Sequence, residues 1–85
     1  MATVTMRYWA AARDAAGVAE QRVTADTLAE ALATAGEPAG RERLAAVFTR
    51  SSFLVDGNPV GLRAADAIQL DDGSVVEVLP PFAGG

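Results

Sequence analysis

The stretch Val75-Val76-Glu77-Val78-Leu79-Pro80-Pro81-Phe82-Ala83-Gly84-Gly85 decides how this chain is built. Its first five residues form a short apolar run rich in valine, which is typical of a buried β-strand. Pro80 ends that strand because proline lacks the N–H that a ladder needs and fixes its own φ. We therefore expect a domain of residues 1–79 followed by a tail of residues 80–85.

The tail combines a stiff stalk with a flexible tip. Pro80 and Pro81 favour an extended polyproline-like segment. Gly84 and Gly85 have no Cβ, so they can enter a narrow slot, and the functional group at the tip is the terminal carboxylate. The alternative is a frayed end without function, but frayed ends are usually attached through a soft linker, and this tail follows a strand directly.

Composition restricts what the domain can do. The chain has 85 residues, 51% of them hydrophobic and 21% charged, which indicates one soluble globular domain. No apolar run approaches the roughly 20 residues of a membrane helix, and the amino-terminal residues form no signal segment. We therefore expect a cytoplasmic protein without a membrane partner.

The missing residue types restrict its chemistry further. The chain has no cysteine and no histidine, so thiolate catalysis, a zinc ribbon and a histidine general base are excluded. A net charge of -4 and seven scattered arginines argue against a nucleic-acid surface. Asp71-Asp72-Gly73 is typical of a turn, and we expect no metal site there. An enzyme that works alone is not expected.

Alternating polarity predicts strands over residues 3–9, 18–25, 52–55 and 75–79, with a short edge strand over 60–62. Val4, Met6 and Tyr8 should share one buried face of the first strand. Residues 10–17 are expected to be a loop with at most one helical turn, because the segment is short. Residues 56–59, Asp-Gly-Asn-Pro, predict a turn.

A helix is expected from Thr27, which can cap it with Glu30 three residues on, while Asp26 is the competing cap. Gly36 should end it as a carboxyl-terminal glycine. The apolar stripe of this helix consists of Leu28, Ala31, Leu32 and Ala35. A shorter helix over residues 41–48 should bury Leu44, Val47 and Phe48 and leave Arg41, Glu42 and Arg43 on a solvated face. The elements together predict an α+β domain, in which a mixed sheet of about five strands wraps one main helix plus a short helix.

Three segments resemble one known family. They are Met6-Arg7-Tyr8-Trp9-Ala10-Ala11-Ala12-Arg13-Asp14, Leu70-Asp71-Asp72-Gly73-Ser74-Val75, and the tail Pro80-Pro81-Phe82-Ala83-Gly84-Gly85. The chain resembles the MoaD/ThiS family of ubiquitin-like sulfur carriers, and within it the small subunits of molybdopterin synthases. This resemblance implies the ubiquitin-like β-grasp fold, in which the first and last strands lie side by side and parallel.

The resemblance also implies a chemistry for the tail. Gly85 would be adenylated by an ATP-dependent partner enzyme and converted to a thiocarboxylate, which donates sulfur to the molybdopterin precursor. A large subunit would hold that precursor and carry the catalytic residues, and the small subunit would bind no permanent cofactor. Pro80, Pro81, Phe82, Ala83 and Gly84 would thread the tail into the partner. Phe82 departs from the family, where a smaller apolar residue is more usual, and this suggests a wider channel.

Such a carrier needs a docking surface for its partners. Trp9 falls on the opposite face of its strand from Val4, Met6 and Tyr8, and Leu79 on the opposite face from Val78. If the two strands are neighbours, Trp9 and Leu79 meet on the helix-free face beside the tail, with Arg7 and Arg13 at the rim. The alternative is that Trp9 packs under a loop or in a dimer contact.

Other functions remain open for this sequence. They are a related sulfur carrier for thiamine or cysteine synthesis, a ubiquitin-like modifier joined through Gly85 to a lysine of a target, and an interaction module with an inert tail. Deleting Gly84 and Gly85 separates the last of these from the others, because a pure binding module would keep its activity.

Overall fold

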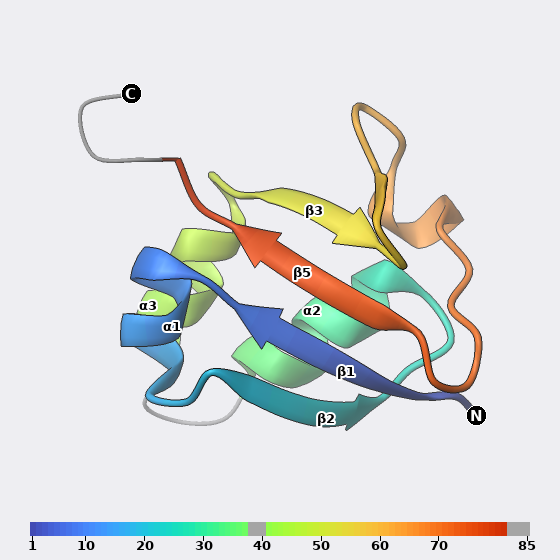
Figure 1. Ribbon diagram of the computed structural model, residues 1–85, viewed down its shortest axis with the longest axis horizontal. Helices are drawn as coiled ribbons and strands as arrows, with labels where there is room; N and C mark the ends of the chain where they lie inside the picture. The colour runs from blue at the N-terminus through green and yellow to red at the C-terminus, as the bar shows by residue number, and fades with distance from the viewer. Residues whose placement is uncertain (38–40, 82–85) are drawn as a thin grey trace.

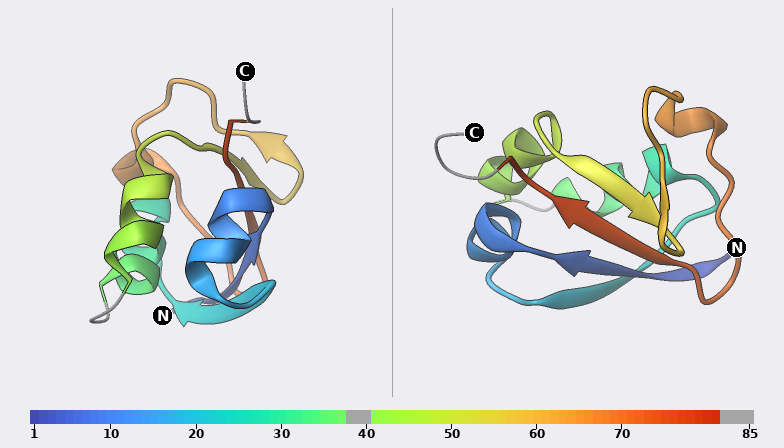
Figure 2. Two further views of the ribbon diagram at one scale, coloured as in Figure 1. Left: turned by 90° about the vertical axis from the view of Figure 1, so that its left-hand side faces the viewer. Right: turned by 45° about the horizontal axis from the view of Figure 1, so that its top comes forward.

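The computed structural model describes residues 1–37 and 41–81, and the calls on residues 38–40 and 82–85 lie outside them. The strands are β1 (Thr3–Tyr8), β2 (Glu20–Thr24), β3 (Ser52–Val55), β4 (Asn58–Pro59) and β5 (Val75–Leu79). The helices are α1 (Ala10–Ala16), α2 (Leu28–Gly36), α3 (Glu42–Phe48) and the 3-10 turn η1 (Ala65–Ala67). The chain forms a five-stranded mixed sheet with helices against one face, which confirms the α+β prediction (Figures 1 and 2).

The strand order is β2-β1-β5-β3-β4, with β1 and β5 parallel in the middle and all other pairs antiparallel (Figure 1). Because β1 and β5 are parallel, β5 ends at the opposite end of the molecule from the amino terminus. The expected adjacency of the first and last strands is therefore confirmed, and the tail begins at the end of a central strand.

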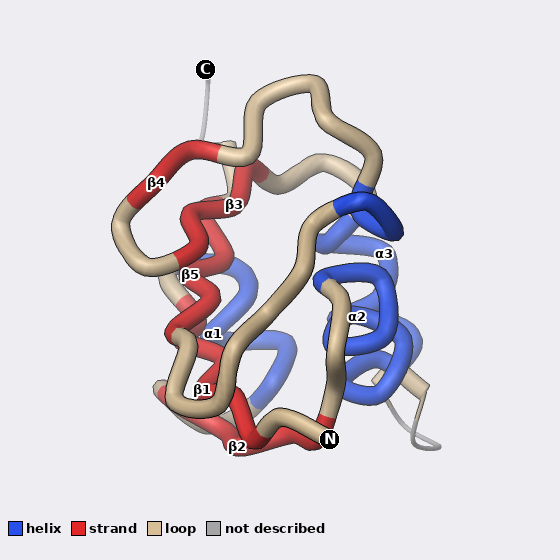
Figure 3. Tube along the Cα trace, turned by 90° about the vertical axis from the view of Figure 1, so that its right-hand side faces the viewer, coloured by secondary structure: helices blue, strands red, loops and turns tan. Residues whose placement is uncertain are grey.

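The core lies between the sheet and the helices, as the view in Figure 3 shows for α2 and α3. Val4, Met6 and Tyr8 on β1, with Val76 and Val78 on β5, are all at most 2% exposed. The helices cover them with Leu28, Ala31, Ala35, Leu44, Val47 and Phe48, all of which are buried. The predicted inward faces of β1, β5 and both predicted helices are thus confirmed.

The segment from Ala10 is a helix, so the expectation of a loop with at most one helical turn was wrong. Local propensity would not hold seven residues in a helix, but tertiary packing does. Ala12 is fully buried, and α1 packs against α3. Gly17 ends α1 in the left-handed conformation, with φ 79°.

The cap of α2 is as predicted, but its end is not. Thr27 Oγ1 accepts a hydrogen bond from the Glu30 N–H at 3.1 Å, and the Glu30 carboxylate accepts one from the Asp26 N–H at 2.7 Å. Gly36 is the last helical residue and does not have positive φ. A Cβ at Gly36 would lie 3.2 Å from the Cβ of Ala45 on α3, so this glycine is needed where the two helices approach each other closely.

The edge strand predicted over residues 60–62 was also wrong, since β4 consists of Asn58 and Pro59. Asp56 and Gly57 both have positive φ, 51° and 83°, as a two-residue type I′ hairpin turn requires. Such a turn places Asn58 directly opposite Val55, so the return strand starts at once. The sequence prediction had counted Asn58 and Pro59 in the turn.

Candidate functional site: the tail root and the open face of the sheet

The tail leaves from the end of β5, which is hydrogen-bonded on both sides. Leu79, the last residue of β5, pairs with Ser52 of β3, and Val78 accepts a hydrogen bond from the Trp9 N–H at 3.3 Å. Pro80 is buried and Pro81 is exposed, so the described chain reaches solvent at Pro81. The root of the tail is therefore held by a rigid central strand.

The predicted tail residues Phe82, Ala83, Gly84 and Gly85 lie outside the described residues. The structure shows where these residues are attached to the domain. They follow Pro81, which is two residues beyond the end of β5 at Leu79.

A largely apolar surface lies on the helix-free face beside this root, with Glu77 between Val75 and Leu79 along β5. Side chains opposite one another in paired strands point to the same face. The register therefore places Leu79 of β5 and Leu54 of β3 on this face, with Pro59 of β4 beyond Leu54. Val75 lies further along β5 on the same face.

Trp9 completes this surface and is held in place by two contacts. Its indole Nε1 donates to Glu77 Oε1 at 3.2 Å, and its backbone N–H donates to the Val78 carbonyl. Ala10, with φ 48°, turns the chain sharply from β1 into α1 directly after Trp9. Trp9 is 47% exposed, so the residue is anchored but still offers part of its surface to a partner.

The two predicted rim arginines lie beside Trp9 but differ in their pairing. Arg7 pairs with Glu20 at 2.9 Å and approaches Glu77 at 3.9 Å. Arg13 projects from α1 and is exposed. These residues border an open groove of about 460 Å³, lined by Arg7, Tyr8, Trp9, Arg13, Ala19 and Glu20. The structure thus brings Trp9, Arg7 and Arg13 together around one groove.

Sequence reasoning missed Leu54 and Pro59 as members of the apolar surface. Leu54 reaches it only because β3 pairs with β5 in the register that sets Leu54 opposite Glu77. That register depends on a long-range contact, which the alternation within residues 52–55 does not report. We call the set Trp9, Leu79, Leu54, Val75 and Pro59 the apolar patch.

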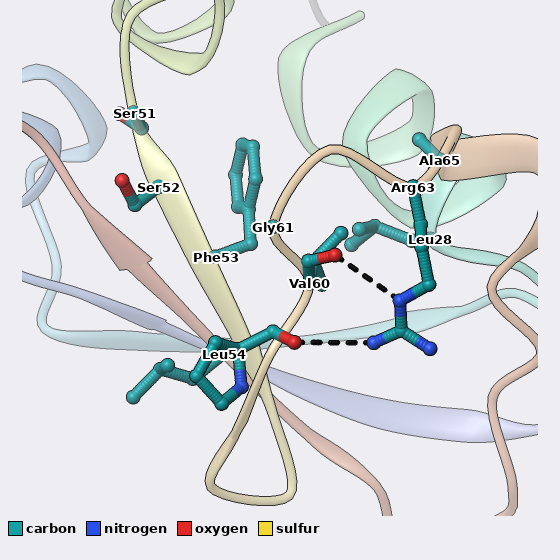
Figure 4. Close-up of a pocket in the computed structure, with 10 residues that line it drawn as sticks. Leu28, Ser51, Ser52, Phe53, Leu54, Val60, Gly61, Arg63 and Ala65 are labelled. Carbon is teal, nitrogen blue, oxygen red and sulfur yellow. Dashed lines mark hydrogen bonds between the residues drawn. The ribbon is translucent and has the colours of Figure 1, made fainter.

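A second groove, of about 330 Å³, lies along the β4 side of β3, shares Leu54 and Pro59 with the apolar patch, and is drawn in Figure 4. Phe53, Leu28 and Val60 supply much of its apolar wall. Arg63 crosses its mouth and donates to the carbonyls of Val60 and Pro59, both at 3.1 Å. Its guanidinium therefore satisfies backbone acceptors at the β4 edge of the sheet.

A partly buried polar network joins β1, β2 and the start of α3 behind the first groove. The Tyr8 hydroxyl donates to Gln21 Oε1 at 2.7 Å, and Arg41 Nη1 donates to the same oxygen at 2.6 Å. The predicted solvated face was therefore wrong for Arg41, which is half-buried and bonds to a half-buried acceptor. Burial raises the pKa of Tyr8 to about 12, while the neighbouring Arg41 lowers it by a smaller amount.

Tyr8 is the only tyrosine of the chain, so its ionisation can be followed alone by tyrosinate absorbance. We expect a midpoint near 12 in the folded protein and near 10 in denaturant. Because the folded state holds the proton more tightly, this contribution to stability is complete below pH 10 and is lost as pH rises toward 12. A folded-state midpoint equal to that in denaturant would show that the Tyr8 hydroxyl is open to solvent.

The described residues form neither a metal site nor a membrane-spanning helix. Within residues 1–37 and 41–81, no group of three or more acidic side chains is placed to hold a metal ion. Asp71 and Asp72 instead belong to a turn, as predicted, with Gly73 at φ 88° and Asp72 accepting a hydrogen bond from the Thr3 N–H at 2.8 Å. In the same part of the chain, no helix has the length and apolarity needed to span a membrane.

Comparison with known proteins gives a family and a set of structural neighbours. The ThiS family model matches residues 6–85. The small archaeal modifier protein 1 of Methanosarcina acetivorans has 22% identity and a TM-score of 0.76, covering 100% of this chain and 98% of its own. A putative molybdopterin converting factor subunit 1 of Pyrococcus furiosus has 21% identity and a TM-score of 0.73, covering 96% and 100%.

A third neighbour is a complex. In the complex of subunits 1 and 2 of the molybdopterin-converting factor of Helicobacter pylori, the matching chain has 22% identity and a TM-score of 0.68, with coverage of 98% and 99%. No curated protein sequence matches the chain significantly. At these identities the structural neighbours establish the ubiquitin-like β-grasp fold.

Proposed function

The chain belongs to the ThiS family, and on this premise we propose that it is a sulfur carrier whose Gly85 is adenylated and then converted to a thiocarboxylate. The observation that carries the proposal is the family match through to Gly85, in a tail that follows the central strand β5 with only two prolines at its base.

The chemistry follows from the group at the tip. An α-carboxyl group has a pKa near 3.5, so at neutral pH it is an anion and a poor electrophile. An activating enzyme with ATP would join it to AMP and release pyrophosphate. A sulfide equivalent would then attack the acyl carbon and displace AMP, which leaves a thiocarboxylate. The sulfur of that group is a better nucleophile than the original oxygen.

The partners would supply what this chain lacks. With no cysteine and no histidine, it offers no thiolate and no near-neutral general base. We assign the acid–base groups to the activating enzyme and to a large subunit, with ATP as a substrate of the former. The apolar patch with Arg7 and Arg13 would dock these partners, and Pro80, Pro81, Phe82, Ala83 and Gly84 would thread the tail.

For the client we propose the molybdopterin precursor, with this chain as the small subunit of a molybdopterin synthase in the cytoplasm. Two structural neighbours are molybdopterin-converting factor subunits, and one of them forms a complex with subunit 2. A carrier for thiamine or cysteine synthesis would use the same tail chemistry with another client. A protein modifier is the second candidate, because another neighbour is a small archaeal modifier protein.

Intact-mass measurement tests the proposal. The protein is incubated with ATP, a sulfide source and an activating enzyme shown to work on another carrier. We expect a mass gain equal to one oxygen-to-sulfur exchange, located at Gly85 by fragmentation. An unchanged mass would rule out the sulfur carrier, whereas a covalent adduct with a lysine of another protein would favour the modifier.

A further inference from the structure

The two edges of the sheet are built differently. At the β4 edge, Pro59 has no N–H to offer, and the Arg63 guanidinium occupies the carbonyls of Pro59 and Val60 (Figure 4). Proteins block edge strands in this way to prevent pairing with other chains. Strand β2 forms the other edge, and Figure 1 shows no described strand beyond it.

The outer side of β2 presents backbone groups that have no hydrogen-bond partner among residues 1–37 and 41–81. The Tyr8 N–H bonds to the Ala19 carbonyl and the Ala25 N–H to the Ala2 carbonyl, at 2.8 and 2.9 Å. In an antiparallel ladder, bonding residues alternate with residues whose N–H and C=O face the other way. The alternation leaves the backbone groups of Glu20, Arg22 and Thr24 facing outward, and none of these is a proline.

The side chains of these residues make the edge self-complementary. Glu20, Arg22 and Thr24 are all exposed and point to the helix-free face. If two copies of β2 pair antiparallel with Gln21 on the two-fold axis, Glu20 of each copy lies opposite Arg22 of the other. The two strands then exchange backbone hydrogen bonds and form two opposite-charge pairs.

Neighbouring registers are less favourable. Moving the axis to Glu20 sets the two Glu20 carboxylates opposite each other, and moving it to Arg22 sets the two guanidinium groups opposite each other. Like charges directly opposite in a sheet are destabilising. The charge pattern therefore favours the Gln21-centred register over both of its immediate neighbours.

From this geometry we propose that two copies of the chain associate through their β2 edges in the Gln21-centred register and form one continuous sheet. The tail root and the part of the apolar patch formed by Leu79, Leu54 and Pro59 remain accessible, because β1 separates β5, β3 and β4 from the β2 edge. The proposal does not depend on sulfur chemistry.

Charge reversal tests the register by sedimentation equilibrium. Glu20→Arg and Arg22→Glu each replace two attractive pairs by two repulsive ones. Each variant alone should therefore associate at least roughly tenfold more weakly than wild type. Mixing the two variants restores opposite charges across the axis, and we expect a heterodimer of about wild-type affinity. A variant that merely failed to fold would not recover on mixing.

The wild-type protein provides a check that needs no substitution. The outward N–H groups of Glu20, Arg22 and Thr24 should exchange with solvent quickly in dilute protein and become protected as concentration rises. A wild type that stays monomeric over the whole accessible range overturns the proposal. Association that survives both charge reversals but is lost in Trp9→Ala also overturns it, because the contact would then be the apolar patch.

Discussion

Removing Gly84 and Gly85 is expected to abolish sulfur loading and leave the fold unchanged. The deletion takes away the proposed acceptor carboxyl and moves the new chain end about 7 Å closer to β5, since each extended residue spans roughly 3.3–3.6 Å. It also leaves Ala83, which has a Cβ, where the slot of the partner would have to accept glycine. Sulfur loading of the shortened chain should therefore fall to the background of the assay.

The measurement is the intact-mass assay with the activating enzyme, run on the deletion and on a matched variant. Thr34→Ser changes an exposed residue of α2 and keeps the whole tail, so this variant should still gain one sulfur. Both proteins should melt at the wild-type temperature, because the residues deleted lie beyond Pro81. Full sulfur loading of the shortened chain would contradict the assignment of Gly85 and place the acceptor elsewhere.

The strands and helices that pack with a clear period could be predicted from the sequence. Val4, Met6 and Tyr8 alternate, Leu28, Ala31 and Ala35 follow a helical stripe, and both patterns face the core as expected. These signals are local, because each periodic pattern of apolar residues lies within a single strand or helix. The adjacency of β1 and β5 came instead from resemblance to a family.

The features that failed depend on contacts between distant segments. The helix α1 exists because Ala12 is buried near α3, Gly36 is required by Ala45, and Arg41 is drawn inward by Gln21. Those contacting residues lie in distant parts of the sequence, so the pattern of a single segment does not reveal them. The same reason explains why Leu54 was missed from the candidate site while Trp9 and Leu79 were found.

Truncating the apolar patch is expected to weaken binding to the partner by a large factor. Trp9 is anchored by Glu77 and by the Val78 carbonyl, so its ring can dock without losing much side-chain freedom. Aromatic anchors of this kind typically cost about 2–4 kcal/mol when cut to alanine, which corresponds to roughly 30- to 1,000-fold in affinity. We expect Trp9→Ala to fall in this range.

Leu54→Ala should weaken binding as well, by roughly tenfold, because Leu54 lies within the same patch although the sequence did not reveal it. Thr24→Ala is the matched control, since Thr24 is exposed on the same face of the sheet but on the β2 edge, away from the tail root. Affinity for a large subunit would be measured by calorimetry, with thermal melting as the check on folding.

Equal losses of affinity for Thr24→Ala and Trp9→Ala would place the docking surface over the whole sheet. An unchanged affinity in both Trp9→Ala and Leu54→Ala would leave the tail as the sole determinant of binding, and the anchoring of Trp9 by Glu77 would then serve the fold alone.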